Sequence, residues 1–162
     1  MASDNFLKID SIKGESTDDK HKDWIEVLSY QFGVSQMASA ADRSATGAAA
    51  GQRADFQDLS IIKHMDISST PIFKACAAGN HIKEVILELC RAGGDKQKYM
   101  EYRLADVIVS SVSTSGGEGG EATESVTFNF GKIEQTYTKI NRDGKPAGQQ
   151  PAGWDLVANK PV

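Results

Sequence analysis

The sequence is poor in cysteine, histidine and aromatic residues, which limits the chemistry that it can perform. Two cysteines and three histidines occur among 162 residues, and no two histidines lie at the short spacing typical of a metal pair. Cys76 and Cys90 lie among apolar or small residues, so we interpret both as reduced structural thiols rather than as a disulfide. Because neither cysteine lies at metal-ligand spacing, the sequence predicts no metal site and no cofactor.

The sequence also lacks a membrane-spanning run, a targeting signal and a basic patch. No stretch approaches the roughly 20 apolar residues that cross a bilayer, and residues 1–6 lack the basic region and apolar run of a secretory signal. The net charge is −4 and the lysines are scattered, which argues against nucleic-acid binding. We therefore expect synthesis and assembly in the cytoplasm, no membrane insertion, and export, if it occurs, without a cleaved signal.

Motifs of common enzymes are missing as well. Serines are plentiful, but no Gly-x-Ser-x-Gly motif places one on a nucleophile turn. The glycine cluster at residues 116–120 joins two predicted strands and carries Glu118, whereas a phosphate-binding loop leads into a helix and attracts anions. The chain is therefore predicted to have no catalytic residues and not to be an enzyme.

Hydrophobic alternation predicts strands over most of the chain. Apolar and polar side chains alternate with a period of two, which is typical of strands that bury one face. The predicted strands cover residues 6–12, 24–34, 56–65, 99–112 and 125–140. Together with the length, this pattern predicts one domain over residues 1–162, built as an antiparallel β-barrel or sandwich.

Four segments depart from the strand pattern. One short helix is predicted after Thr70, with Thr70 as its cap, Pro71 at its first position and Gly79 at its end. Residues 81–92 fit a buried strand or a helix equally well. The remaining two segments are predicted to be irregular: residues 35–54, an exposed loop rich in Ala, Ser and Gly, and residues 142–162, a C-terminal tail.

Blocks of sequence along nearly the whole chain carry a family resemblance. They are residues 6–9, 13–16, His21, and residues 25–36, 58–60, 69–71, 91–94, 106–113, 124–130 and 153–155. In this order the blocks resemble the haemolysin-coregulated protein (Hcp) family. The resemblance implies a mostly β fold, a two-sheet antiparallel β-barrel with one short flanking α-helix, similar to phage tail-tube proteins. It also implies a strand at residues 81–91.

The resemblance further implies a structural role in the type VI secretion system. Family members form hexameric rings that stack into a hollow tube, which carries effector proteins in its lumen and is propelled into a target cell. The implied partners are further copies of the chain, the contractile sheath, baseplate proteins, the VgrG spike and effectors. The alternative hypotheses are a monomeric small β-barrel that binds a ligand and a hydrolase that uses one of the serines.

Strand alternation indicates which side chains would line such a tube. The side chains predicted to face the core are Leu28, Tyr30 and Phe32 in one strand and Phe128 and Phe130 in another. The polar residues between them face outward, where they form either a hydrated channel wall that contacts cargo or a plain solvent face. These candidates are Ser29, Gln31, Thr127 and Asn129. The candidates for ring stacking or partner contact are the loop residues Gln36, Arg43, Gln52, Asp95 and Glu118.

Overall fold

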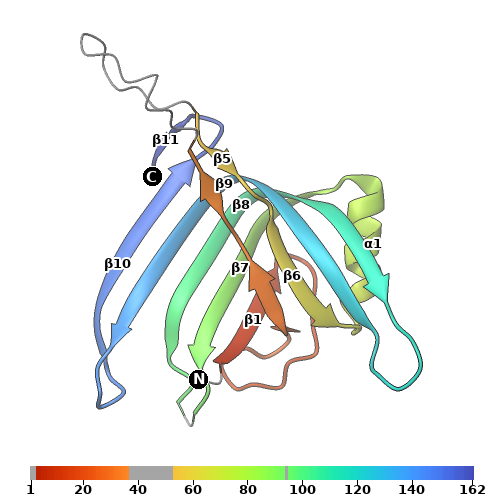
Figure 1. The fold of residues 1–162 in the computed structure, drawn as a ribbon, viewed down its shortest axis with the longest axis horizontal. Coiled ribbons are helices and arrows are strands. Elements are labelled where there is room, and N and C mark those ends of the chain that lie inside the picture. The colour runs from red at the N-terminus through yellow and green to blue at the C-terminus, as the bar shows by residue number, and fades with distance from the viewer. Residues whose placement is uncertain (1–2, 37–52, 94) are drawn as a thin grey trace.

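The computed structural model describes residues 3–36, 53–93 and 95–162. Its strands are β1 (Ser3–Ile9), β2 (Ile25–Val27), β3 (Ser29–Gln31), β4 (Val34–Ser35), β5 (Asp55–Phe56), β6 (Leu59–His64), β7 (His81–Arg91), β8 (Lys98–Ser115), β9 (Thr123–Ile140), β10 (Pro146–Asp155) and β11 (Lys160–Pro161). The helix α1 spans Ser69–Ala78 (Figure 1). The predictions of a mostly β, antiparallel fold with one short helix, and of a strand at 81–91, are confirmed.

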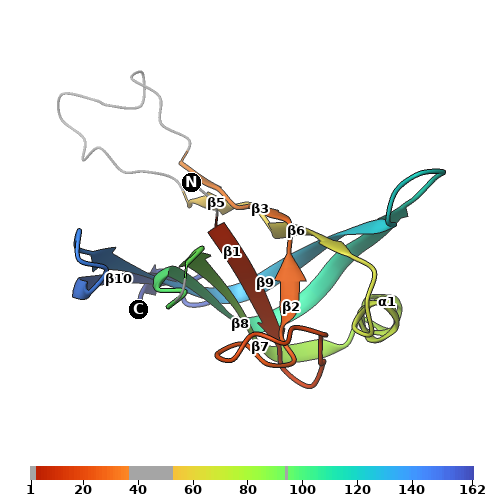
Figure 2. The same ribbon diagram turned by 90° about the horizontal axis from the view of Figure 1, so that it is seen from below.

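The long strands β8 and β9 form the centre of the sheet. Within the described residues, nine strands share one sheet, in which the order β11-β10-β9-β8-β7-β1-β2 forms one path. One edge of β9 pairs with β8. Along its opposite edge, the first half of β9 pairs with β6 and the second half pairs with β10. All of these pairs are antiparallel, and Figure 2 shows the β8–β9 hairpin extending well beyond α1.

A single residue separates β2 from β3, and the two strands have different partners. β2 pairs with β1, whereas β3 pairs with β6, and between them Leu28 donates its backbone N–H to Ile62 at 2.8 Å. The chain therefore turns from one partner strand to another at Leu28. Beyond β3, the short strands β4 and β5, which precede and follow residues 37–52 in the sequence, pair with each other.

The hydrophobic core lies on one face of the sheet, and the buried side of α1 packs against it. On β9 the buried positions alternate strictly at Val126, Phe128 and Phe130, which confirms the two phenylalanines as core residues. The core receives Leu7 and Ile9 from β1, Val85, Leu87 and Leu89 from β7, and Ile72 and Ala75 from α1. Burial of these faces stabilises the fold by about 25 cal/mol for each Å² of apolar surface.

The segment between β1 and β2 covers the opposite face of β1 and β7. Phe6 and Cys90 are buried there although their neighbours in sequence face the core. The His21 ring stacks on Phe6 with a centroid distance of 4.1 Å, and Trp24 meets His21 edge-on at 4.9 Å. Gly14 is required in this segment, because a Cβ atom would lie only 2.4 Å from the Trp24 carbonyl oxygen.

The helix begins two residues earlier than the sequence predicts. Ser68 is the N-cap and Ser69 the first helical residue, so Thr70 does not cap the helix and Pro71 is not at its first position. The Ser69 hydroxyl accepts a hydrogen bond from the Asp66 N–H at 3.0 Å, which fixes this start. Pro71 remains compatible because the first turn needs no N–H donor. Gly79, with φ of 63°, ends the helix as predicted.

The predicted inward face of the strand at residues 24–34 is partly wrong. Leu28 is 51% exposed and Tyr30 is 39% exposed, whereas Phe32 packs against the core. The core on β2 receives Ile25 and Val27 instead. The reason is the turn at Leu28, which interrupts the alternation that a single straight strand would maintain.

The predicted irregular tail at residues 142–162 is largely a strand. β10 runs along the second half of β9 in register from Gln149↔Thr138 to Asp155↔Lys132. Its prolines are compatible with an extended chain, and a register shift between Pro146 and Gln149 accommodates Gly148 at φ of 139°. The long partner strand imposes an extended conformation that the local composition does not indicate. Among the described residues, no helix combines the length and apolarity needed to cross a bilayer.

A charged pair is buried where β6 and β9 meet the start of α1. Lys63 is 0% exposed and Glu124 is 4% exposed, and their Nζ and Oε2 atoms are 2.8 Å apart. The Lys63 ammonium also donates to Asp66 at 3.1 Å and to the Ser69 hydroxyl at 3.2 Å. These contacts satisfy the donors of the Lys63 ammonium, so its buried charge is compensated. They also link the start of α1 to β6 and β9.

Replacement of Glu124 alone should therefore be strongly destabilising. We expect Glu124→Leu to lower the free energy of unfolding by about 3–5 kcal/mol, because it leaves the Lys63 charge buried without its closest partner. The double variant Lys63→Met, Glu124→Leu should recover most of this loss. Denaturant unfolding at one fixed protein concentration measures both values. A double variant as unstable as Glu124→Leu would show that the unpaired Lys63 charge is not the cause of the lost stability.

Candidate functional site

Four neighbouring strands present small polar side chains on the face away from the core. Residues opposite each other in an antiparallel pair lie on the same face of a sheet. One row across β3, β6, β9 and β8 consists of Gln31, Ser60, Thr127 and Ser111, and the next of Ser29, Ile62, Ser125 and Ser113. Apart from Ile62, every side chain in these rows is polar and uncharged. We call these two rows, with Asp58 and Asn129, the polar face.

Asp58, directly before β6, joins the polar face into a hydrogen-bonded network. Its Oδ2 accepts from the Ser110 hydroxyl at 2.7 Å, and its Oδ1 accepts from the Asn129 amide at 3.0 Å. The Thr127 hydroxyl lies 2.7 Å from that of Ser110 and 2.6 Å from that of Ser111. Both serines reach Thr127 because β8 has an extra residue at Ser110 in its register with β9.

The network is suited to reversible contacts rather than to catalysis. Its members are hydroxyls, an amide and one carboxylate, and these described contacts include no imidazole or amine that would activate a hydroxyl. Exposed hydroxyls and amides exchange hydrogen bonds with water or with a partner at little net cost. The polar face therefore offers hydrogen-bonding groups that can exchange between water and a partner.

The structure brings the predicted channel-wall residues together on this face. Ser29, Gln31 and Asn129 are exposed, and Thr127 is half-buried and hydrogen-bonded to two serines. The predicted outward orientation of Ser29 and Gln31 is confirmed, although the pattern that suggested it was interrupted at Leu28. A role of these residues as a channel wall stays a prediction.

The predicted loop residues are spread over the molecule. Asp95 and Glu118 are both exposed and lie in the turns at opposite ends of β8. The backbone oxygen of Asp95 accepts from the Lys20 ammonium at 2.8 Å. Gln36 is exposed directly after β4. Arg43 and Gln52 lie outside the described residues, as does most of the predicted loop at 35–54.

Sequence reasoning missed five polar members of the polar face, and it also missed Ser110, which bonds to two residues of this face. The five are Asp58, Ser60, Ser111, Ser113 and Ser125. The alternation that identifies Thr127 also applies to Ser60, which lies between the buried Leu59 and Ile61, so this signal was present. The contacts of Asp58 had no comparable signal because its partners lie 52 and 71 residues away in sequence.

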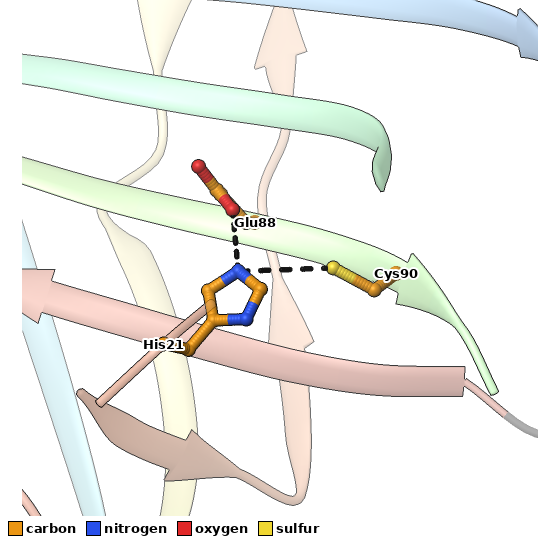
Figure 3. Close-up of side chains that lie close together, drawn as sticks. All are labelled: His21, Glu88 and Cys90. Carbon is orange, nitrogen blue, oxygen red and sulfur yellow. Dashed lines mark hydrogen bonds and ion pairs between the residues drawn. The ribbon is translucent and has the colours of Figure 1, made fainter. Parts of the chain in front are cut away.

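A second polar cluster is buried between the β1–β2 segment and β7. His21 Nδ1 lies 2.7 Å from Asp18 Oδ2, and His21 Nε2 lies 2.6 Å from Glu88 Oε2. Cys90, two residues after Glu88 on the same strand, places its Sγ 4.0 Å from His21 Nε2 (Figure 3). Lys96 Nζ lies 3.0 Å from Asp18 Oδ1 on the outer side. The imidazole is therefore held between two carboxylates at its two nitrogens.

These surroundings change the pKa of two groups in opposite directions. Hydrogen bonds from His21 and then Lys96 lower the pKa of Asp18 to about 2. Burial raises the pKa of the Cys90 thiol to about 11, and the nearby Glu88 charge adds to this effect. Asp18 is thus held as a carboxylate, whereas Cys90 is held as a neutral thiol. Cys76, packed partly against the core, and Cys90 are both free cysteines.

Comparisons with known proteins identify the family. A family model described as "Type VI secretion system effector, Hcp" matches residues 6–137. The protein hcp1 of Pseudomonas aeruginosa is 40% identical over 163 residues, covering 98% of each chain. A solved structure described as a type six secretion system protein has a TM-score of 0.92 at 34% identity, covering 99% of this chain and 100% of that one. Hcp1 from Salmonella typhimurium has a TM-score of 0.81 at 36% identity, with the same coverage.

The antiparallel sheet, its flanking helix and its polar face place the chain in the class of mostly β proteins, as does its likeness to the solved structures. The chain belongs to the Hcp family and is a tube protein of the type VI secretion system. The predicted family and function are confirmed, and the alternative of a monomeric ligand-binding barrel is not supported.

The stabilising contribution of Asp18 should depend on pH. Because its pKa is about 2 in the folded protein and 3.8 ordinarily, the Asp18 contribution is fully present above about pH 4 and is lost as the pH falls toward 2. We expect Asp18→Asn to be less stable than the unmodified chain at neutral pH. The difference should shrink as the solution is acidified, and denaturant unfolding at several pH values measures it. A difference that stays constant down to about pH 3 would contradict this account.

Proposed function

We propose that copies of this chain close into hexameric rings that stack into the inner tube of the type VI secretion apparatus, with the polar face toward the channel. The observation that carries this proposal is the run of uncharged polar side chains across β3, β6, β9 and β8. Such a wall stays hydrated and offers donors and acceptors to cargo of varied sequence. Because it lacks a deep apolar site, cargo can be held and still released.

We further propose that the sheet closes on itself as a barrel within each subunit. The support is the turn at Leu28, which passes the chain from the partner strand β1 to the partner strand β6. Hydrogen-bonded neighbours lead from β9 through β8, β7 and β1 to β2. The chain then passes through Leu28 into β3, which pairs with β6, and β6 pairs in turn with β9. A closed sheet leaves few open strand edges, which favours defined contacts between copies.

Neighbouring copies would cover the apolar surface beside α1. Phe73 is 66% exposed and Ile67 is 63% exposed, and Met65 is also exposed. Large apolar side chains exposed on α1 and in the segment before it are suited to contact with another copy of the chain. The turns near Asp95 and Glu118 lie at opposite ends of β8, so they are suited to contacts between stacked rings. The sheath, baseplate and VgrG spike are further proposed partners, with effectors in the channel and export through the apparatus itself.

The first test is the mass of the purified protein. We expect multi-angle light scattering to give about six times the chain mass of 17.5 kDa, because the apolar surface beside α1 would be buried between copies. The variant Phe73→Glu should shift the population toward single chains. A mass of one chain at every concentration tested would contradict ring formation.

The second test concerns the polar face. We expect the double variant Gln31→Lys, Asn129→Lys to form rings of unchanged mass and to retain less effector in a pull-down, because charge replaces neutral donors and acceptors on the proposed wall. Thr17→Lys adds a lysine at an exposed position in the β1–β2 segment and serves as the control. Equal effector retention by the double variant and the control would exclude this face as the cargo surface.

A further inference from the structure

The buried cluster at His21 contains three different metal-ligand types at one point. Atoms of His21, Glu88 and Cys90 lie within 4.8 Å of one another. Figure 3 shows the imidazole directed at both β7 side chains, which project from the same face of that strand. His21 and Cys90 are buried, and Glu88 is partly buried. Nitrogen, sulfur and oxygen donors of these kinds form the usual ligand set of Zn²⁺.

We propose that His21, Glu88 and Cys90 form a Zn²⁺ site, with Asp18 as the residue that positions His21. The distances permit it, because tetrahedral Zn²⁺ with bonds of about 2.0–2.3 Å holds its ligand atoms roughly 3.3–3.6 Å apart. The Cys90–His21 separation of 4.0 Å needs a small contraction and the His21–Glu88 separation of 2.6 Å a small expansion. Side-chain rotation can supply changes of this size.

The surroundings of His21 match those of a metal-bound histidine. A ligand histidine usually gives its second ring N–H to a carboxylate, which fixes the ring and the nitrogen that is free to bind the metal. Here Asp18 accepts from Nδ1 at 2.7 Å, which directs Nε2 toward Glu88 and Cys90. Stacking on Phe6 and contact with Trp24 hold the ring in this plane.

The charge and the access of the site are also suitable. One carboxylate and one thiolate together neutralise Zn²⁺, so the occupied site adds no net charge to a buried position. On binding, the Cys90 thiol proton and the proton between Nε2 and Glu88 Oε2 leave to solvent. A pocket of about 340 Å³ opens onto His21 and Glu88, so a metal ion can enter and water can serve as a fourth ligand.

A purely structural role of the cluster is the competing explanation. In that case the two carboxylates hold the imidazole by hydrogen bonds alone, and Lys98, 3.5 Å from Glu88 Oε1, completes the charge balance. This arrangement would bind no transition metal and would leave Cys90 as an inert packing residue. The two explanations differ in whether the sulfur of Cys90 bonds to a metal.

Cobalt substitution in the full-length protein distinguishes them. We expect the chelator-treated protein to bind one Co²⁺ per chain, with a thiolate-to-cobalt charge-transfer band that Zn²⁺ abolishes by displacement. Cys90→Ser should lose this band, and Cys76→Ser, which removes the other free cysteine, should retain it. Absence of the band in the unmodified protein, or its persistence in Cys90→Ser, would overturn the proposal.

Two further measurements keep the test independent of any one variant. X-ray absorption of the zinc-loaded, unmodified protein should show one sulfur ligand among nitrogen and oxygen, and a spectrum without sulfur would overturn the site. Asp18→Asn should weaken zinc binding about 10–100-fold while keeping the cobalt–thiolate band, as expected for a positioning residue. An unchanged zinc affinity in Asp18→Asn would remove Asp18 from the proposal.

Discussion

The alternation of side chains along β8 and β9 is the constraint on which the rest of the structure depends. The two strands pair over most of their length, and every second residue of the first half of β9 enters the core. This pairing leaves both the second edge of β9 and its outer face available. The edge receives β6 and β10 in succession, and the outer face becomes the polar face.

The outer surface of the sheet has two different uses. Over β1 and β7 the segment that contains His21 and Trp24 covers it and buries Phe6, Cys90 and a network of charged groups. Over β6 and β9 it stays open and presents hydroxyls and amides. The first use adds a second packing layer behind the core, and the second supplies a surface suited to transient contacts. One strand pattern thus supports both stability and the proposed transport role.

The sequence predicted those features that depend on local pattern. Phe128 and Phe130 alternate within one uninterrupted strand, and Gly79 ends the helix by its own backbone conformation. The strand at 81–91 required the family resemblance, because its apolar run suits a helix equally well. The irregular tail was wrong because β10 owes its extended form to pairing with β9 rather than to its own Pro- and Gly-rich composition. The inward positions of Leu28 and Tyr30 were wrong because the chain changes partner at Leu28.

In the candidate sites too, residues placed by a local strand pattern could be predicted, and contacts between distant residues could not. Thr127 and Asn129 could be identified from alternation alone, whereas their link through Asp58 depends on residues distant in sequence. His21 showed no signal of a site, since Glu88 lies 67 residues away and reaches it only through the packing of the β1–β2 segment on β7. Contacts made by tertiary packing, unlike strand faces, have no periodic pattern in the sequence.

The central claim is that the polar face encloses the channel of an assembled ring. A cryo-electron microscopy map of the purified assembly, at a resolution that separates strands, tests it most directly. We predict that Gln31, Thr127 and Asn129 border the central opening. A ring in which these residues lie on the outer circumference or between subunits, or particles without an opening, would contradict the account.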